Sequence, residues 1–153
     1  MTTTLELHTI GFALVADAER LMDAVEPGAT VLADHGYGPV TIRTRRVYTP
    51  ERDTLTLIAM HGEDLAASVI ATTKGSRISA RIHQMRLAEL LFTRRGDWGF
   101  VAIGRVEGRR RRFELTATRN RTWQVQVNGE DPTVWPSLTA AAEHITTTYA
   151  PTR

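Results

Sequence analysis

The sequence predicts an α+β protein: a small β-barrel with an amino-terminal helix, followed by a three-stranded antiparallel sheet packed on a carboxyl-terminal helix. Three observations predict it. Short alternating segments separated by turn residues fill residues 29–82, three further alternating segments lie in 98–128, and an alanine-rich segment with helical periodicity follows at 137–149. We therefore expect two parts, residues 1–82 and 83–153, which can also share one core.

The amino-terminal part is expected to begin with a short strand over Leu5–Thr9 and a helix over residues 11–26. Pro27-Gly28 ends this helix. Its outer side is acidic, and we expect that side to be a solvated surface. The apolar residues of its inner side recur at helical spacing: Ala13, Leu14, Ala18, Leu21, Met22 and Val25.

Residues 29–82 predict about five short strands, because apolar and polar residues alternate between turns rich in glycine and proline. Regular short strands of this kind favour a closed or nearly closed barrel. The segment Pro27-Gly-Ala-Thr-Val-Leu, followed by Gly36-Tyr-Gly-Pro-Val-Thr-Ile42, resembles the start of a small SH3-like barrel. The resemblance covers residues 27–82, and such barrels occur in nucleic-acid-associated proteins.

Residues 83–95 are expected to form a buried helix that connects the two parts. In a helix these residues would place apolar side chains on nearly every side, as in helices that are buried in a core. These residues are Met85, Leu87, Ala88, Leu90, Leu91 and Phe92.

The carboxyl-terminal part predicts strands over 99–106, 109–118 and 122–128. Asn128-Gly129 predicts a tight turn, since both residues tolerate positive φ. Pro132 and Pro136 are expected to keep the next loop out of regular structure. Ser137 is the expected N-cap of the last helix. We expect one buried cluster of Trp123, Val125, Leu115, Ala141 and Ile145, and we expect Trp98 and Trp135 to pack at the core or edge of the sheet rather than stack on bases.

Arginine is concentrated in the second part. Residues 83–153 hold 11 basic and 7 acidic residues, a net charge of +4, whereas residues 1–82 hold 8 basic and 10 acidic residues, a net of −2. Lys74 is the only lysine, a bias typical of a GC-rich genome. Guanidinium groups bind phosphates bidentately, so the arginine cluster indicates nucleic-acid binding, with a solubilising edge strand as the alternative. The candidate binding residues are Arg105, Arg110, Arg112, Arg119, Arg121, Gln124 and Gln126.

The order of strands and helix in 98–149 resembles the amino-terminal DNA-binding domains of tyrosine integrases and the related plant ethylene-response domains. The matching pattern is Trp123-Gln-Val-Gln-Val-Asn-Gly129, followed by Ser137-Leu-Thr-Ala-Ala-Ala-Glu143. In those families the sheet lies in the DNA major groove and a helix backs it. The resemblance implies that Arg110, Arg112, Gln124 and Gln126 face the groove.

Other classes of function have little support in the sequence. We find no glycine-rich phosphate loop, no nucleophile elbow and no metal-ligand spacing among the five histidines, so we expect no cofactor, no metal and no enzymatic activity. His61 with Glu63 and Asp64, and Asp34 with His35, are the nearest to an acid–base or metal site. The absence of cysteine fits the cytoplasm, and no apolar run is long enough for a membrane helix.

The sequence thus favours a small non-enzymatic accessory protein that binds DNA or RNA, from a phage or mobile element. The alternative is a protein-interaction module, such as a phage inhibitor of a host factor or a component of a phage particle. In that case the acidic side of helix 11–26 and the arginine-rich strand face would be the contact surfaces.

Overall fold

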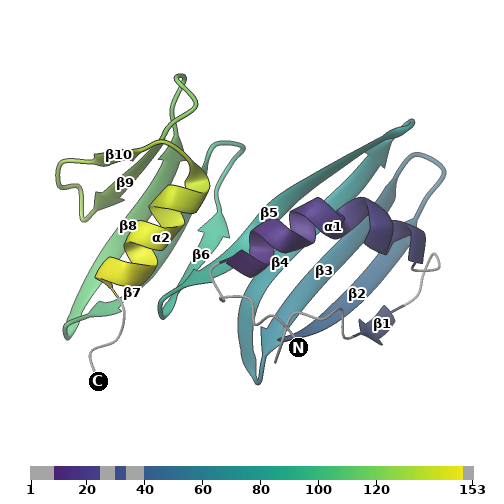
Figure 1. Cartoon of the computed structure of the whole chain (residues 1–153), viewed down its shortest axis with the longest axis horizontal. Helices are drawn as coiled ribbons and strands as arrows, with labels where there is room; N and C mark the ends of the chain where they lie inside the picture. Colours follow the sequence, from purple (N-terminus) through teal and green to yellow (C-terminus); the bar gives the residue numbers. More distant parts are fainter. Residues whose placement is uncertain (1–8, 25–29, 34–39, 150–153) are drawn as a thin grey trace, which may run out of the picture. The chain divides into compact units, whose positions relative to one another are not determined.

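The computed structural model describes residues 9–24, 30–33 and 40–149, and these divide into two compact units, residues 1–85 and 86–153. The ten strands form one antiparallel order, β1 to β10, and the part that each unit contributes, called its sheet below, carries one helix on one face (Figure 1). The expected strand over Leu5–Thr9 lies outside the described residues, apart from Thr9.

The first unit has five strands, which lie in the sheet in the order in which they occur in the chain. The predicted amino-terminal helix is confirmed, because α1 spans Ile10–Ala24. The strands are β1 (Thr30–Ala33), β2 (Val40–Tyr48), β3 (Asp53–His61), β4 (Asp64–Lys74) and β5 (Arg77–Leu87).

Alternation along these strands gives the first sheet one apolar face. In β3 the residues Leu55, Leu57 and Ala59 are fully buried, whereas the residues between them are only half-buried. Helix α1 packs on β3 and β4 and contributes Leu14 and Leu21 to the same core. Burial of apolar surface at about 25 cal/mol per Å² is what holds this helix on the sheet.

The predicted SH3-like barrel over 27–82 is wrong. Strands β1 and β5 lie on opposite sides of the five-stranded order and are not paired with each other, so the sheet is open. The physical reason is α1, which covers the apolar face that a barrel would have to close upon. The strands are also longer than expected, since residues 40–48 form one continuous strand of 9 residues.

The predicted connector helix over 83–95 is also wrong. Strand β5 continues to Leu87, the chain turns at Ala88 with φ 55°, and β6 begins at Leu90. Within each strand the burial has a period of two: Met85 and Leu87 are buried in β5, Leu90 and Phe92 are buried in β6, and the residues next to them are not. Pairing with adjacent strands satisfies the backbone of this segment, so its apolar residues need no helix to reach the core.

The second unit carries β6 (Leu90–Arg94), β7 (Gly99–Val106), β8 (Arg109–Ala117), β9 (Trp123–Val127), β10 (Thr133–Trp135) and α2 (Leu138–Thr148). The three predicted strands, the turn at Asn128-Gly129 and the final helix are confirmed. Ser137 is the N-cap, as expected, and its hydroxyl accepts a hydrogen bond from the amide of Ala140 at 3.1 Å. The loop expected to lack regular structure contains β10 instead.

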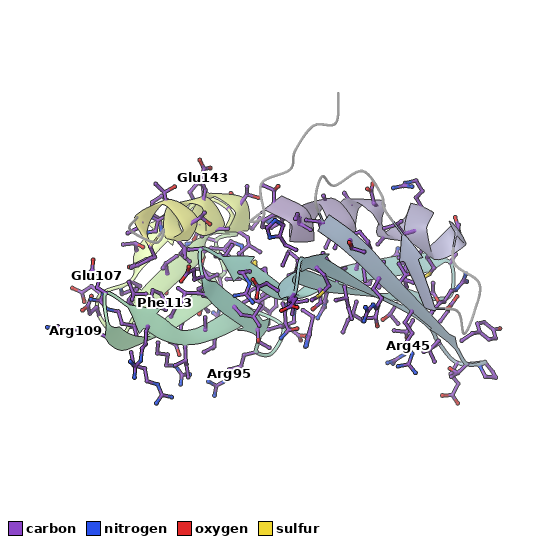
Figure 2. All side chains as sticks on the ribbon, turned by 90° about the horizontal axis from the view of Figure 1, so that it is seen from below. Arg45, Arg95, Glu107, Arg109, Phe113 and Glu143 are labelled. Atoms are coloured by element: carbon purple, nitrogen blue, oxygen red, sulfur yellow. The ribbon has the colours of Figure 1, made fainter. Side chains whose placement is uncertain are left out.

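The core of the second unit lies between its sheet and α2 (Figure 2). Leu115, Val125, Ala141 and Ile145 are buried as predicted, but Trp123 is only half-buried and its ring lies 6.2 Å from that of Phe100. The expectation that Trp98 packs at the core or edge of the sheet is wrong, because 68% of this residue is exposed.

Candidate nucleic-acid interface

The face of the second sheet opposite α2 carries most of the predicted binding residues, and we call it the C-terminal open face. Phe113 and Leu115 point into the core, so the intervening residues of β8 lie on the other side. Figure 2 shows Phe113 between the sheet and α2, and Arg95 projecting away from the helix. Strand pairing places these residues on the open face: Val101, Ile103, Arg105, Arg110, Arg112, Glu114, Thr116, Gln124, Gln126 and Val134.

Two arginines face each other on this surface. Arg105 of β7 and Arg110 of β8 are directly opposite partners in the antiparallel pair, and both are exposed. The pair flanks the tight turn at Glu107-Gly108, where φ is 54° and 77°. Like charges that are directly opposite each other in a sheet destabilise it, so this arrangement favours an anion between them.

Arg112 is the third arginine of the face and is held by Glu114, two residues along β8. Its Nε and Nη2 atoms both lie 3.1 Å from Glu114 Oε1. Its backbone is fixed as well, because the amide of Arg112 donates to Asn128 Oδ1 at 2.8 Å and its carbonyl accepts from the Asn128 amide at 2.8 Å. The position of Arg112 is therefore well defined, but its charge is partly compensated.

The two glutamines extend the polar surface onto β9. Gln126 lies opposite Glu114 and Gln124 lies opposite Thr116. Arg119 and Arg121 are exposed in the turn between β8 and β9, beyond the end of the paired residues. The structure therefore brings five of the seven predicted binding residues onto one face and places the other two at its rim.

A second arginine-bearing face, on the first unit, was not predicted. It is the side of β2–β5 opposite α1, and we call it the N-terminal open face. Its exposed basic residues are Arg43, Arg45, Arg77 and Arg81. Figure 2 shows Arg45 pointing away from α1.

On this face the strand register places basic, polar and apolar side chains in one row across the sheet. Arg45 pairs with Thr56, Thr56 with Ile70, and Ile70 with Arg81, across four strands. A shallow depression of about 280 Å³ lies at Arg43, Arg45 and Ile58. Within the paired residues of β2 to β5, this side of the sheet carries no acidic residue.

The N-terminal open face was missed because a barrel was expected over this segment. The alternation in Thr41-Ile-Arg-Thr-Arg45 was the feature that could have revealed it. Ile42 and Thr44 are buried there and Arg43 and Arg45 are exposed, the pattern of a sheet with one solvated face.

The other candidate sites do not gain support from their surroundings. Over residues 9–24, 30–33 and 40–149, no group of three histidine, cysteine or acidic residues is arranged to hold a metal ion. His61 and Asp64 are opposite partners at the turn between β3 and β4 and are exposed, whereas Asp34 and His35 lie outside the described residues. Neither α1 nor α2, the helices that the structure describes, is long and apolar enough to cross a membrane.

Comparison with protein-family models, with curated proteins and with solved structures finds no match to this chain.

Proposed function

We propose that this protein is a small, non-enzymatic, cytoplasmic accessory protein that binds nucleic acid through phosphate contacts on the C-terminal open face. The observation that carries the proposal is the opposed pair of Arg105 and Arg110, with Arg112 next but one along β8. An anion such as a phosphate between these guanidinium groups would relieve their repulsion and accept bidentate hydrogen bonds. The helix-backed three-stranded arrangement resembles the sheet with which integrase amino-terminal domains read DNA.

The charge on this face predicts the strength and salt dependence of binding. Three arginines that each neutralise one phosphate of duplex DNA give a log–log salt slope of about −3, at about 0.9 per contact. Such a protein binds weakly at physiological salt and much more tightly at low salt. Phosphate contacts position a protein but read no sequence, so we expect little discrimination between sequences.

Replacing Arg110 and Arg112 together by glutamate is expected to weaken DNA binding by about 100-fold or more at low salt. The change removes two phosphate contacts and introduces repulsion. Exposed charges contribute little to folding, so the melting temperature should stay within a few degrees of the wild-type value. Fluorescence anisotropy with a labelled duplex at two salt concentrations measures the loss in affinity and the loss of slope together.

The matched control is the double variant Arg43→Glu, Arg45→Glu on the N-terminal open face. Both double variants change the formal net charge from +2 to −2, so they share any non-specific electrostatic effect. A clearly larger loss for the Arg110 and Arg112 variant supports the proposal. An equal or larger loss for the control contradicts it and assigns binding to the N-terminal open face. Failure of the wild-type protein to bind at low salt rules out both surfaces.

Glu114→Gln is expected to tighten binding, by about threefold at low salt. The substitution removes the one acidic side chain on the paired strands of this face and releases Arg112 from its ion pair. Because Arg112 already counts as one of the three phosphate contacts, the salt slope should stay near about −3. Titration of the variant against the same duplex measures both quantities. Unchanged or weaker binding would show that Arg112 does not contact phosphate.

A protein partner is the second candidate, because the same face exposes apolar side chains. Ile103 is 54% exposed and lies opposite Arg112, and Val134 is 60% exposed and lies opposite Gln124. Protein interfaces combine an apolar centre with an enrichment in arginine, which fits this surface. Substituting Ile103 by serine separates the two candidates, since a phosphate-contacting surface should retain its DNA affinity and a protein interface should lose its partner.

A further inference from the structure

The exposed indole of Trp98 sets this residue apart from the other tryptophans. Trp123 and Trp135 are half-buried, and each has a ring neighbour: Phe100 at 6.2 Å for Trp123 and His144 at 4.3 Å for Trp135. Trp98 is 68% exposed, and none of the rings in the described segments is a neighbour of it. An exposed tryptophan does not contribute the large burial of apolar area that usually stabilises this residue in a core.

The backbone holds Trp98 firmly despite its exposure. Its carbonyl accepts a hydrogen bond from the amide of Ala117 at 2.7 Å, and the next carbonyl, that of Gly99, accepts from the Arg95 amide at 2.9 Å. Gly99 is needed at this point, because a Cβ added there would lie 2.8 Å from the carbonyl oxygen of Leu115. The indole is therefore attached to the end of a strand pair rather than to a free loop.

A depression of about 480 Å³ lies beside this tryptophan. It is lined by Arg95, Trp98, Gly99, Phe100, Val101, Arg112, Glu114, Leu115 and Thr116. Its volume is within the range of about 300–1,000 Å³ that small ligands occupy. Its lining combines an aromatic surface, two guanidinium groups, a hydroxyl and the carboxylate of Glu114, which is paired with Arg112. Arg112 also belongs to the C-terminal open face.

We propose that this depression binds an unpaired nucleobase stacked on Trp98, with the flanking phosphates held by Arg95 and Arg112. The inference rests on the proposed function and deepens it, because it names single-stranded DNA or RNA as the preferred ligand. In a duplex the faces of the bases are stacked on one another, and only edges and phosphates are available to a protein. In a single strand each base offers a face that an aromatic side chain can cover.

The test compares four labelled 15-nucleotide probes with the full chain at low salt: oligo-dT, oligo-rU, a mixed-sequence duplex and an abasic deoxyribose-phosphate strand. Wild-type protein is expected to bind oligo-dT or oligo-rU at least about 10-fold more tightly than the abasic strand, since one stacked base is worth about that factor. Trp98→Ala should abolish this advantage and leave the affinity for the abasic strand and the duplex within twofold. Trp98→Phe should restore part of it, because a phenyl ring still stacks.

The outcomes separate this inference from the function on which it rests. If oligo-dT and oligo-rU bind Trp98→Ala as tightly as they bind the wild-type protein, the proposed base site is wrong. The phosphate surface is then still supported if the variant with glutamate at positions 110 and 112 loses duplex binding. If wild-type protein binds none of the probes, the proposed function fails first. Because thymine and uracil also differ by a methyl group, an added oligo-dU probe is compared with oligo-rU, and a difference between these two assigns the site to DNA or to RNA. Because Trp98 is exposed, the variant should keep the wild-type melting temperature, and each comparison refers to folded protein.

Discussion

Phe113→Ala is expected to lower the free energy of unfolding of the second unit by about 3–5 kcal/mol, the usual cost of removing a buried phenyl ring. Phe113 is fully buried in the middle of β8. Its ring meets those of Phe92 and Tyr149 edge to face, with centroids 6.3 Å and 5.0 Å away. Alanine would leave a cavity between the sheet and α2 and remove both ring contacts, which add to the loss of apolar burial.

Tryptophan fluorescence is the appropriate measurement, because all three tryptophans, Trp98, Trp123 and Trp135, lie in the second unit. The fluorescence transition in urea should move to a much lower concentration in Phe113→Ala. Trp98→Ala is the matched control, since it also truncates an aromatic residue, and at 68% exposure it should change stability by no more than about 0.5 kcal/mol. A cost below about 1 kcal/mol for Phe113→Ala would contradict the assignment of this ring to the core.

Much of the second unit could be predicted from its sequence, because local chemistry and final packing agree there. The alternation in Phe113-Glu-Leu115 and in Trp123-Gln-Val125 specifies which side of each strand is buried. Asn128 and Gly129 adopt the positive φ of 52° and 74° that a tight hairpin turn requires. The shared face of Arg110, Arg112, Gln124 and Gln126 followed directly from this alternation, whereas that of Arg105 did not, because residues 99–106 are apolar on both sides.

The first unit could be predicted only in part, because alternation does not tell what covers an apolar face. A closed barrel and a sheet under α1 both bury Leu55 and Leu57, and only tertiary contacts decide between them. The prediction of a helix over residues 83–95 is wrong for a different reason. Short apolar segments of this kind fit a helix and a strand equally well, and the edge contributed by β7 decides the outcome for β6.

The exposure of Trp98 could not be predicted either, since aromatic residues in small domains are usually buried. Only the fold shows that Trp98 directly precedes β7, where its carbonyl is bonded to the Ala117 amide while its side chain stays 68% exposed. The depression beside Trp98 likewise depends on the register of β8, which brings Arg112, Glu114 and Thr116 to the same face.

Arg46→Met is expected to lower the stability of the first unit by about 3 kcal/mol, as is typical when one partner of a largely buried ion pair is removed. The Arg46 and Asp53 side chains are only 18% and 11% exposed, on neighbouring strands. Arg46 Nε lies 3.0 Å and 3.1 Å from the two Asp53 oxygens, its Nη2 forms an ion pair with the same carboxylate, and its Nη1 donates to the carbonyl of Met22 at 2.8 Å. One side chain thus joins β2, β3 and the last turns of α1.

Far-UV circular dichroism measures this change, because it reports both units, while tryptophan fluorescence reports only the second. If the units unfold independently, Arg46→Met shifts the dichroism transition and leaves the fluorescence transition in place. Equal shifts of both would show that the two units unfold as one. The double variant Arg46→Met, Asp53→Leu should recover part of the loss, since replacing both partners leaves no unpaired buried charge. No recovery would indicate that the bond to Met22 is the dominant contribution.

The pH dependence of this stability loss is expected to identify Asp53 as the group through which Arg46 acts. Its hydrogen bonds from Arg46 hold the pKa of the Asp53 carboxyl below its ordinary value. Its contribution to stability is therefore complete above the unfolded-state pKa of about 3.9 and is lost as the pH falls through the folded value. Without Arg46, burial raises the pKa of this carboxyl instead, so ionisation destabilises the variant as the pH rises. The stability difference between wild type and Arg46→Met should be small near pH 2 and grow towards its full value by about pH 6. A difference that does not depend on pH would show that Arg46 acts through packing and its bond to α1 rather than through the charge of Asp53.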